Sequence, residues 1–460
     1  MTESYARSLS SHFHSGDSRF AKGYLSAKHK SHTAVLAKSL ILVIMANGII
    51  ANYMPSKSVN IGTFCIDALV LLLFAYALVR ELSANNMSRR SLIPDVTIFL
   101  LFMLIAIFTL LGIITVGYYG PGIPTALRIR FLYWLIAPAM YVLLEPEDVS
   151  EVLHFFIDCG VVFCCLAIAQ ALIPGMLDPK LLYVEYDGVL GLNWSDSTAS
   201  LVLRSNALMG NSIEFGGVCV MLFALALSDL LRSENTPPKI VKIAIIAAGC
   251  YFSYSRIACA GLVVVSAVLY FRLYRKQSSN KFFTFLILAV VFGVAGYFVL
   301  SDSALMNRFY GNDAFTQASN AYHKNSIARA LDVIAENAVF GTGLGTQTVS
   351  SSRVISDGWW FQLAAETGLV VLLLYIFVYL RIAQQVWRSQ KFGGGVEELL
   401  SVVILVCLVY FIVASFINTA FAGRADCSLF MCLVGLYLAS RGCDDRSSSD
   451  FGGHSLDLRY

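Results

Sequence analysis

Arginines beside long apolar runs are the residues of this sequence whose type and position best suit chemistry. A guanidinium group donates through a planar fork that matches phosphate oxygens, so several arginines converging on one cavity would bind a phosphate or diphosphate. The alternative for any one of them is a place at a membrane edge, with its charge in water or paired with a nearby acid. The arginines expected on one side are Arg128, Arg130, Arg204, Arg256, Arg308, Arg329, Arg353 and Arg424.

Arg256 is the most informative of these arginines. It follows Ser253-Tyr254-Ser255, a stretch that joins two apolar runs without room for a loop. Arg256 must therefore lie at or just inside a membrane boundary, where a charge is costly unless it is paired or solvated. This position favours a binding role over simple exposure at the interface.

Acidic and histidine side chains supply the candidate bases. Asp357 precedes an aromatic cluster that begins at Trp359, and it is equally suited to accept a proton or to cap the next helix. Glu366 lies well inside an apolar run, where a carboxylate is expensive. His323 is the only histidine expected on the side of the arginines, although a solvated loop histidine without function is the alternative that we favour.

The glycine run Gly341-Thr342-Gly343-Leu344-Gly345 superficially resembles a dinucleotide fingerprint. It follows an expected helix rather than a strand, which excludes that function. We predict a helix stop with a tight turn, and backbone N–H groups facing an anion are the alternative. The sequence contains no serine–histidine–carboxylate order and no metal-ligand cluster, so we expect neither a metal nor a cofactor.

Composition shows what must position these residues. The chain has 460 residues, 57% of them apolar and 14% charged, and a mean hydropathy of +0.69. Uncharged runs of ~20 residues are typical of membrane-spanning helices, so we predict an all-α polytopic membrane protein with about twelve spans. The net charge of +3 is too small to indicate nucleic-acid binding. The predicted spans are 34–54, 60–80, 94–117, 129–145, 151–173, 211–231, 239–254, 256–274, 282–301, 358–380, 398–419 and 426–440.

Basic loops set the expected orientation, with both termini in the cytoplasm. We predict a disordered cytoplasmic tail over 1–32, a transmembrane domain over 33–440 and a second disordered tail over 441–460. Two long outward loops cover about 174–210 and 302–357. In the second loop, Asn325 or Ser326 is expected to cap an amphipathic helix that rests on the membrane through Ile327, Leu331 and Ile334.

Four segments, taken in order, form a recognisable pattern. They are Arg204 followed by Gly210-Asn211-Ser212-Ile213-Glu214-Phe215-Gly216; Ser253-Tyr254-Ser255-Arg256; Arg329 with Val339-Phe340-Gly341-Thr342-Gly343-Leu344-Gly345; and Asp357-Gly358-Trp359-Trp360-Phe361-Gln362-Leu363-Ala364-Ala365-Glu366-Thr367-Gly368-Leu369. Together they resemble the O-antigen ligase and Wzy-type polysaccharide polymerase superfamily over roughly residues 200–440. Ala338 stands where that family usually has proline.

The resemblance implies a GT-C-like, metal-independent membrane glycosyltransferase that acts in the periplasm on undecaprenyl-diphosphate-linked glycans. Arg204 and Arg256, helped by Arg329, would hold the diphosphate as it leaves. The catalytic candidates are Asp357, His323 and Glu366, and the further substrate-binding candidates are Arg308, Arg130, Asn211 and Glu214.

Ligases of this family usually carry His-Asn where Asp357-Gly358 stands, which favours a polymerase. Such an enzyme would join lipid-linked repeat units into O-antigen, capsule or exopolysaccharide in the bacterial inner membrane, with inversion at the anomeric carbon. Its partners would be the lipid-linked donor and acceptor, membrane lipid, a chain-length regulator and a flippase. The alternatives are a ligase that transfers glycan to lipid A-core and, from another class, a transporter of an anionic solute.

Overall fold

The computed structural model describes a helical body and two short hairpins. The described residues are 32–53, 61–83, 91–120, 122–178, 183–186, 189–192, 194–197, 200–209, 212–232, 237–274, 314–347, 358–392, 395–418 and 423–441. Seven helices among them are long and apolar enough to cross a membrane, so the chain is a polytopic membrane protein. In a bilayer each backbone N–H and C=O group must be paired within the protein, and a helix achieves this within its own segment.

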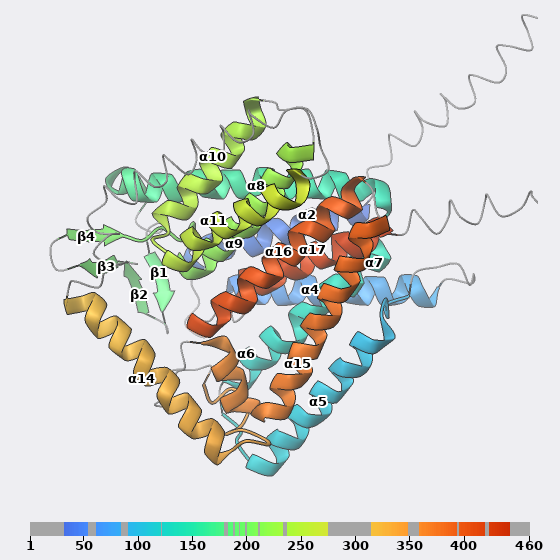
Figure 1. Ribbon diagram of the computed structural model, residues 1–460, viewed down its shortest axis with the longest axis vertical. Helices are drawn as coiled ribbons and strands as arrows, with labels where there is room; N and C mark the ends of the chain where they lie inside the picture. The colour runs from blue at the N-terminus through green and yellow to red at the C-terminus, as the bar shows by residue number, and fades with distance from the viewer. Residues whose placement is uncertain are drawn as a thin grey trace, which may run out of the picture.

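The elements follow the chain from blue to red in Figure 1. The first part contains α2 (His32–Met45), α3 (Asn47–Tyr53), α4 (Ile61–Leu82), α5 (Val96–Val116), α6 (Ile123–Leu127), the π-turn η1 (Arg128–Leu132), the 3-10 turn η2 (Tyr133–Leu135), α7 (Ile136–Leu143), α8 (Pro146–Leu172) and the 3-10 turn η3 (Pro174–Met176). The second part contains α9 (Ser212–Arg232), α10 (Pro237–Phe252), α11 (Arg256–Tyr274), α14 (Ala314–Glu336), α15 (Trp359–Phe392), α16 (Gly395–Ile417) and α17 (Arg424–Ser440).

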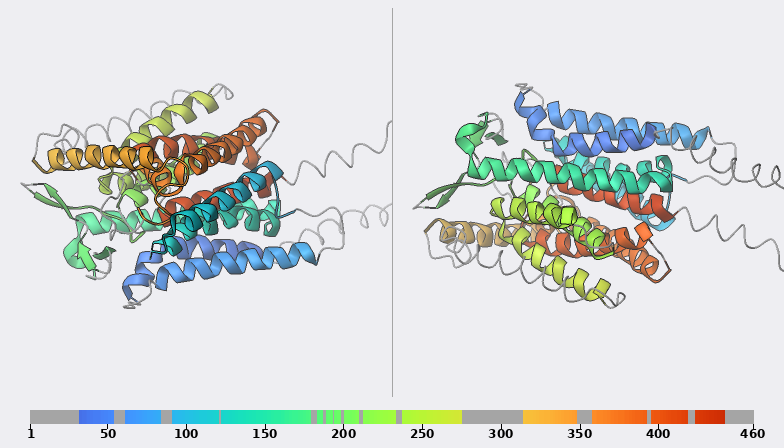
Figure 2. Two further views of the ribbon diagram at one scale, coloured as in Figure 1. Left: turned by 90° about the horizontal axis from the view of Figure 1, so that it is seen from below. Right: turned by 90° about the horizontal axis from the view of Figure 1, so that it is seen from above.

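Helix α9 forms the centre of the bundle, because it is buried along almost its whole length by α10, α11, α16 and α17. Glycines allow this close approach: Gly216 faces Ala258 of α11, and Gly217 faces Asp426 of α17. Most helices run side by side in Figure 2. In Figure 1, α14 lies along one side of the bundle, between the hairpins and the start of α15.

The predicted spans coincide in position with helices wherever the structure describes them. Seven helices among the described residues meet the length and composition of a span, α2 and the part Arg256–Leu269 of α11 are shorter apolar helices, and the number of spans in the whole chain stays a prediction. The predicted span 34–54 is divided between α2 and α3, and Gly48 in α3 donates its N–H to the Leu208 carbonyl at 2.7 Å. The predicted span 282–301 and both predicted tails lie outside the described residues, except for His32 and Arg441.

The segment 174–210, which was predicted to be an outward loop, contains structure that the all-α prediction missed. Two antiparallel hairpins form there, one from β1 (Tyr183–Tyr186) and β2 (Val189–Leu192), the other from β3 (Trp194–Ser197) and β4 (Ser200–Leu203). Short apolar runs interrupted by turn residues carry too weak a signal to separate such strands from loop.

The predicted surface helix exists, but its start and its contacts differ. α14 begins at Ala314, so neither Asn325 nor Ser326 caps it. Leu331 is 50% exposed, whereas Ile334 is buried against Ala364 and Ala365 of α15. The three residues therefore differ in exposure, because Ile334 packs on α15 and Leu331 does not, and contact of this face with a membrane stays a prediction.

Candidate functional site

Arg204 lies at the start of a buried loop that connects β4 to α9. The Ser205 N–H donates to the Phe252 carbonyl at 3.0 Å, and Arg204 Nε donates to the Ser253 carbonyl at 3.4 Å. Ala207 and Leu208 have positive φ angles of 45° and 64°, which is costly for residues with a side chain. Such backbone persists only where its surroundings fix it, and this loop is thereby held against the end of α10.

The loop continues the same network toward α8. The Ala207 N–H donates to Gln170 Oε1 at 3.1 Å, and the Leu208 N–H donates to Asn206 Oδ1 at 3.0 Å. Gln170 and Asn206 are themselves buried. These contacts fix the backbone next to Arg204, whose side chain stays only half-buried.

The hairpin Ser253–Arg256 is as tight as the sequence predicts. Ser253 Oγ donates to the Cys250 carbonyl at 2.6 Å and accepts from the Ser255 N–H at 3.2 Å, while Tyr254 adopts a φ of 51°. α11 then begins at Arg256 itself, whose side chain is half-buried. Gly216 of α9 lies against the hairpin, since a Cβ there would come within 3.1 Å of Ser255 Cβ.

The start of α9 also contacts the start of α17. Glu214, 6% exposed, accepts a hydrogen bond from the Ala425 N–H. Asp426, 1% exposed, interacts electrostatically with Glu214, and its Oδ1 has no hydrogen-bond partner among the described residues. Two close carboxylates in a low-dielectric site disfavour ionising together. The sequence analysis missed Asp426, although an aspartate in an apolar run is a signal for a special site.

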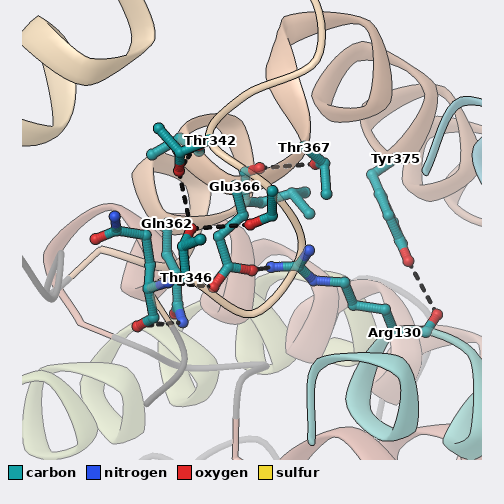
Figure 3. A network of polar contacts seen from close by, with 11 residues as sticks. Arg130, Thr342, Thr346, Gln362, Glu366, Thr367 and Tyr375 are labelled. Atoms are coloured by element: carbon teal, nitrogen blue, oxygen red, sulfur yellow. Dashed lines mark hydrogen bonds and ion pairs between the residues drawn. The ribbon is translucent and has the colours of Figure 1, made fainter. Parts of the chain in front are cut away.

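A second cluster joins Arg130 to Glu366 (Figure 3). Arg130 lies in η1 and is 4% exposed, and Glu366 lies in α15 and is 0% exposed. They form an ion pair, Glu366 Oε1 also accepts from the Gln347 N–H at 2.7 Å, and Tyr375 OH donates to the Arg130 carbonyl at 2.9 Å. Both carboxylate oxygens of Glu366 are therefore engaged by the protein.

The glycine run fills a break in α15 next to this ion pair. Gly368 has φ 84° and ψ 169°, which interrupts the helix, and a Cβ there would overlap the Val339 carbonyl. The freed groups pair with the run: Thr342 N–H donates to the Ala365 carbonyl at 2.8 Å and Gly343 N–H to the Glu366 carbonyl at 3.1 Å. Backbone groups exposed by a helix break must be satisfied in this way within a membrane.

The prediction of a tight turn in this run is therefore confirmed, whereas α14 already ends at Glu336, before the run begins. Leu369 N–H donates to the Ala338 carbonyl at 2.8 Å, so the turn pairs with α15 on both sides of the break. Thr342 Oγ1 lies 2.8 Å from Thr346 Oγ1 and holds the turn closed. The anion that a backbone N–H of this segment meets is the protein's own Glu366 carboxylate.

The structure thus brings some predicted site residues together and leaves others apart. Arg204 meets the Arg256 hairpin, Arg130 meets Glu366, and Glu214 meets the start of α17. Arg329 is exposed on α14, and His323 lies on the same helix. The remaining predictions, Asp357, Arg308, Arg353 and Asn211, fall outside the described residues.

A comparison with known proteins bears on this arrangement. Residues 242–376 match the family Wzy_C, described as O-antigen ligase. The match contains the Arg256 hairpin, α14, the glycine run and Glu366, whereas Arg130, Arg204 and Glu214 precede it. No curated protein matches the chain. Enzymes of the family transfer lipid-linked glycans, as ligases or as polymerases. The chain therefore carries, over residues 242–376, a domain of the Wzy_C O-antigen ligase and polysaccharide polymerase family.

Proposed function

We propose that this chain is a polysaccharide polymerase that joins lipid-linked oligosaccharide repeat units at the outer face of the bacterial inner membrane. The observation that carries the proposal is the meeting of Arg204 with the Ser253–Arg256 hairpin, within hydrogen-bonding reach of its Ser253 carbonyl. The two arginines come from separate parts of the chain, and both side chains are half-buried. Half-buried guanidinium groups keep a strong electrostatic field and still reach a ligand.

In this mechanism Arg204 and Arg256 bind the diphosphate of the donor lipid. As the bond between the anomeric carbon and the diphosphate breaks, negative charge grows on the leaving oxygen, and the two guanidinium groups stabilise it. The hydroxyl of the acceptor sugar attacks the anomeric carbon from the opposite side, which inverts its configuration. Arg329, on the exposed face of α14, is suited to contact the sugars or phosphate from outside.

Asp357 is the proposed base that takes the proton of the acceptor hydroxyl. It directly precedes a firmly held segment, because the Trp359 N–H donates to the Asn418 carbonyl at 3.1 Å and Trp360 Nε1 donates to the Ile412 carbonyl at 3.0 Å. The rings of Trp359 and Trp360 lie 4.7 Å apart and are both buried. These buried rings anchor the start of α15, which follows Asp357 closely in the sequence, and a firmly held neighbouring segment supports a role for Asp357 in positioning a proton acceptor.

Glu366 is less suited to be the base, since both of its oxygens accept from the protein. We propose instead that the Arg130–Glu366 pair locks the glycine run into the break of α15. Because Trp359 opens the same helix, the lock also fixes the segment that follows Asp357. His323 remains an alternative base on α14.

The transporter alternative requires a broken helix that faces a solute path. α15 is broken at Gly368, and η1 and η2 interrupt the segment from Ile123 to Leu143. However, the groups freed in α15 pair with the glycine run, and Arg130 pairs with Glu366. This pairing supports a structural use of the break rather than a transport site.

Glycan length in a deletion strain tests polymerase against ligase. Loss of long chains with single repeat units still attached to their acceptor supports a polymerase. Long chains that stay on the lipid carrier and never reach lipid A-core would instead identify a ligase. Unchanged glycan, combined with solute uptake by the protein in proteoliposomes, would establish the transporter.

The proposed orientation places both termini in the cytoplasm and α14 in the periplasm. A single cysteine in place of exposed Ala328, in a variant without the native cysteines, should react with an impermeant thiol reagent in intact spheroplasts. Reaction only after the inner membrane is permeabilised would reverse the orientation.

A further inference from the structure

An apolar groove lies along α5, between this helix and the rest of the bundle. Its volume is 880 Å³, and its walls come from α4, α5, α6, η1, η2, α7, α15 and α17. Phe74, Leu78, Phe99, Met103 and Trp134 are representative of its lining. The groove exists because α5 packs chiefly on α15 and stands apart from α4 (Figure 1).

Charged groups lie only at the two ends of this groove. Asp67 and Arg128 line one end, and Glu81 with Asp95 line the other. From Asp67 to Glu81, α4 rises about 21 Å at ~1.5 Å per residue. A long, single apolar chain with one polar end would fit this shape, its polar end at the arginine.

Two arginines lie at the Asp67 end, Arg128 in the lining of the groove and Arg424 just outside it. Arg128 Nε donates to Asp67 Oδ2 at 2.6 Å, and Arg424 contacts Thr63 one helical turn earlier on α4. Arg424 also interacts electrostatically with Asp67. The guanidinium groups of Arg128 and Arg424 thus interact with one carboxylate, that of Asp67. Each guanidinium group has further N–H donors that can bind a phosphate.

This end also adjoins the proposed catalytic arginines through α9. Arg424 precedes Ala425, whose N–H donates to Glu214 in the first turn of α9. One turn of α9 includes both Glu214 and Gly216, and Gly216 lies against the Arg256 hairpin. Two arginine pairs therefore flank the start of α9, which is the arrangement needed by an enzyme whose two substrates both carry lipid phosphates.

We propose that this groove binds the polyprenyl chain of the acceptor substrate, with Arg128 and Arg424 holding its phosphate. The inference rests on the proposed polymerase function and names the site of its second lipid. The phosphate of the acceptor lipid keeps the same charge throughout the reaction. Its site therefore has to bind the phosphate but does not have to stabilise charge that develops in the transition state. Arginines partly neutralised by Asp67 suit that task, whereas Arg204 and Arg256 serve the leaving diphosphate.

The test measures binding of a long-chain polyprenyl monophosphate to the full-length protein in phosphatidylcholine nanodiscs. The wild type should bind two equivalents. Ala106→Trp, which fills the groove, should bind one, whereas Leu110→Trp, on the exposed face of α5 and outside the lining, should still bind two. Two equivalents in Ala106→Trp would overturn the proposal.

A milder variant guards against a folding defect. Arg128→Gln should weaken the second equivalent about tenfold and remove its preference for polyprenyl phosphate over uncharged polyprenol. Arg388→Gln, an exposed arginine near the far end of α15, is the control and should bind as the wild type does. Equal displacement of the probe by phosphatidylglycerol would identify an ordinary phospholipid site and reject the proposal.

The two proposals fail differently. One outcome is that Ala106→Trp binds only one equivalent of polyprenyl phosphate while the deletion strain shows the ligase pattern of glycans. In that case the groove is a polyprenyl phosphate site, but the proposals of a polymerase and of an acceptor in this groove are both rejected. If the strain shows the polymerase pattern and Ala106→Trp makes full-length polymer, the polymerase proposal is kept and only the proposal that the groove binds the acceptor is rejected.

Discussion

The Arg204–Arg256 region and the Arg130–Glu366 region use the same guanidinium group in opposite ways. Arg130 is buried, paired with a carboxylate and surrounded by bonds that close the break in α15. Arg204 and Arg256 are half-buried at a loop and a hairpin that contact each other, because Arg204 Nε donates to the Ser253 carbonyl. The Arg130–Glu366 region is closed off from solvent, whereas the arginines of the Arg204–Arg256 region are partly exposed.

The difference shows why an arginine at a span boundary is ambiguous as a functional signal. A charge in a membrane needs compensation, and either the protein or a substrate supplies it. The identity of the partner, rather than the presence of the arginine, separates a structural pair from a binding site. Variants in the two regions, and at the candidate bases Asp357 and His323, separate these roles.

The largest effect is expected at Asp357. If Asp357 is the base, Asp357→Asn should lower polymer synthesis by about 100- to 10,000-fold and leave lipid-linked repeat units to accumulate. If Asp357 only caps α15, the same variant should lose little polymer synthesis, since asparagine caps a helix as well as aspartate. Polymer and lipid-linked intermediates are measured together in the complemented deletion strain. Full activity here, with inactivity of a His323 or Glu366 variant, would remove Asp357 from the mechanism.

Arg256→Lys should follow, with polymer synthesis reduced about 100-fold at a normal protein level. Lysine keeps the charge but loses the planar fork that matches two phosphate oxygens. Arg388→Lys, at an exposed position on α15, is the matched control and should leave polymer unchanged. Normal polymer from Arg256→Lys would reduce Arg256 to a residue of the membrane boundary.

Glu366→Gln should lower the stability of the protein, and any loss of activity should follow from that loss of stability. Removing one partner of a buried ion pair leaves Arg130 uncompensated, at a cost of about 3–5 kcal/mol in the free energy of unfolding. The protein level and thermal stability in detergent should fall. The double variant Arg130→Gln with Glu366→Gln should recover most of that stability, because no unpaired charge remains.

Activity of the double variant decides the role of Glu366. Recovered polymer synthesis identifies a structural lock. A stable double variant that makes no polymer would show that Glu366 or Arg130 acts in the reaction, and the contrast between the two regions would fail.

The smallest effect is expected for His323→Ala. With Asp357 as the base, an α14 histidine contributes at most to sugar binding, and polymer length should stay within about twofold of the wild type. The length distribution on a gel measures this. A complete loss of polymer would transfer the role of base to His323.

The sequence by itself determined the class of the protein and indicated its family. Long uncharged runs require helices in a bilayer, and Ser253-Tyr254-Ser255-Arg256 leaves room only for a tight hairpin. The order of the arginine and glycine motifs was enough to indicate the family. These features are local, since each depends on a short stretch of chain and on the cost of exposing polar groups to lipid.

The tertiary structure alone decided which charges meet. Arg130 and Glu366 are far apart in sequence, so no local pattern could show that they pair or that Glu366 closes a helix break. The same holds for Arg128 and Arg424 around Asp67. The contact of Ile334 in α14 with Ala364 and Ala365 of α15 was likewise not visible in the local pattern. Pairing across a bundle depends on how the helices pack, and that packing determines whether a boundary arginine is buried in an ion pair or partly exposed.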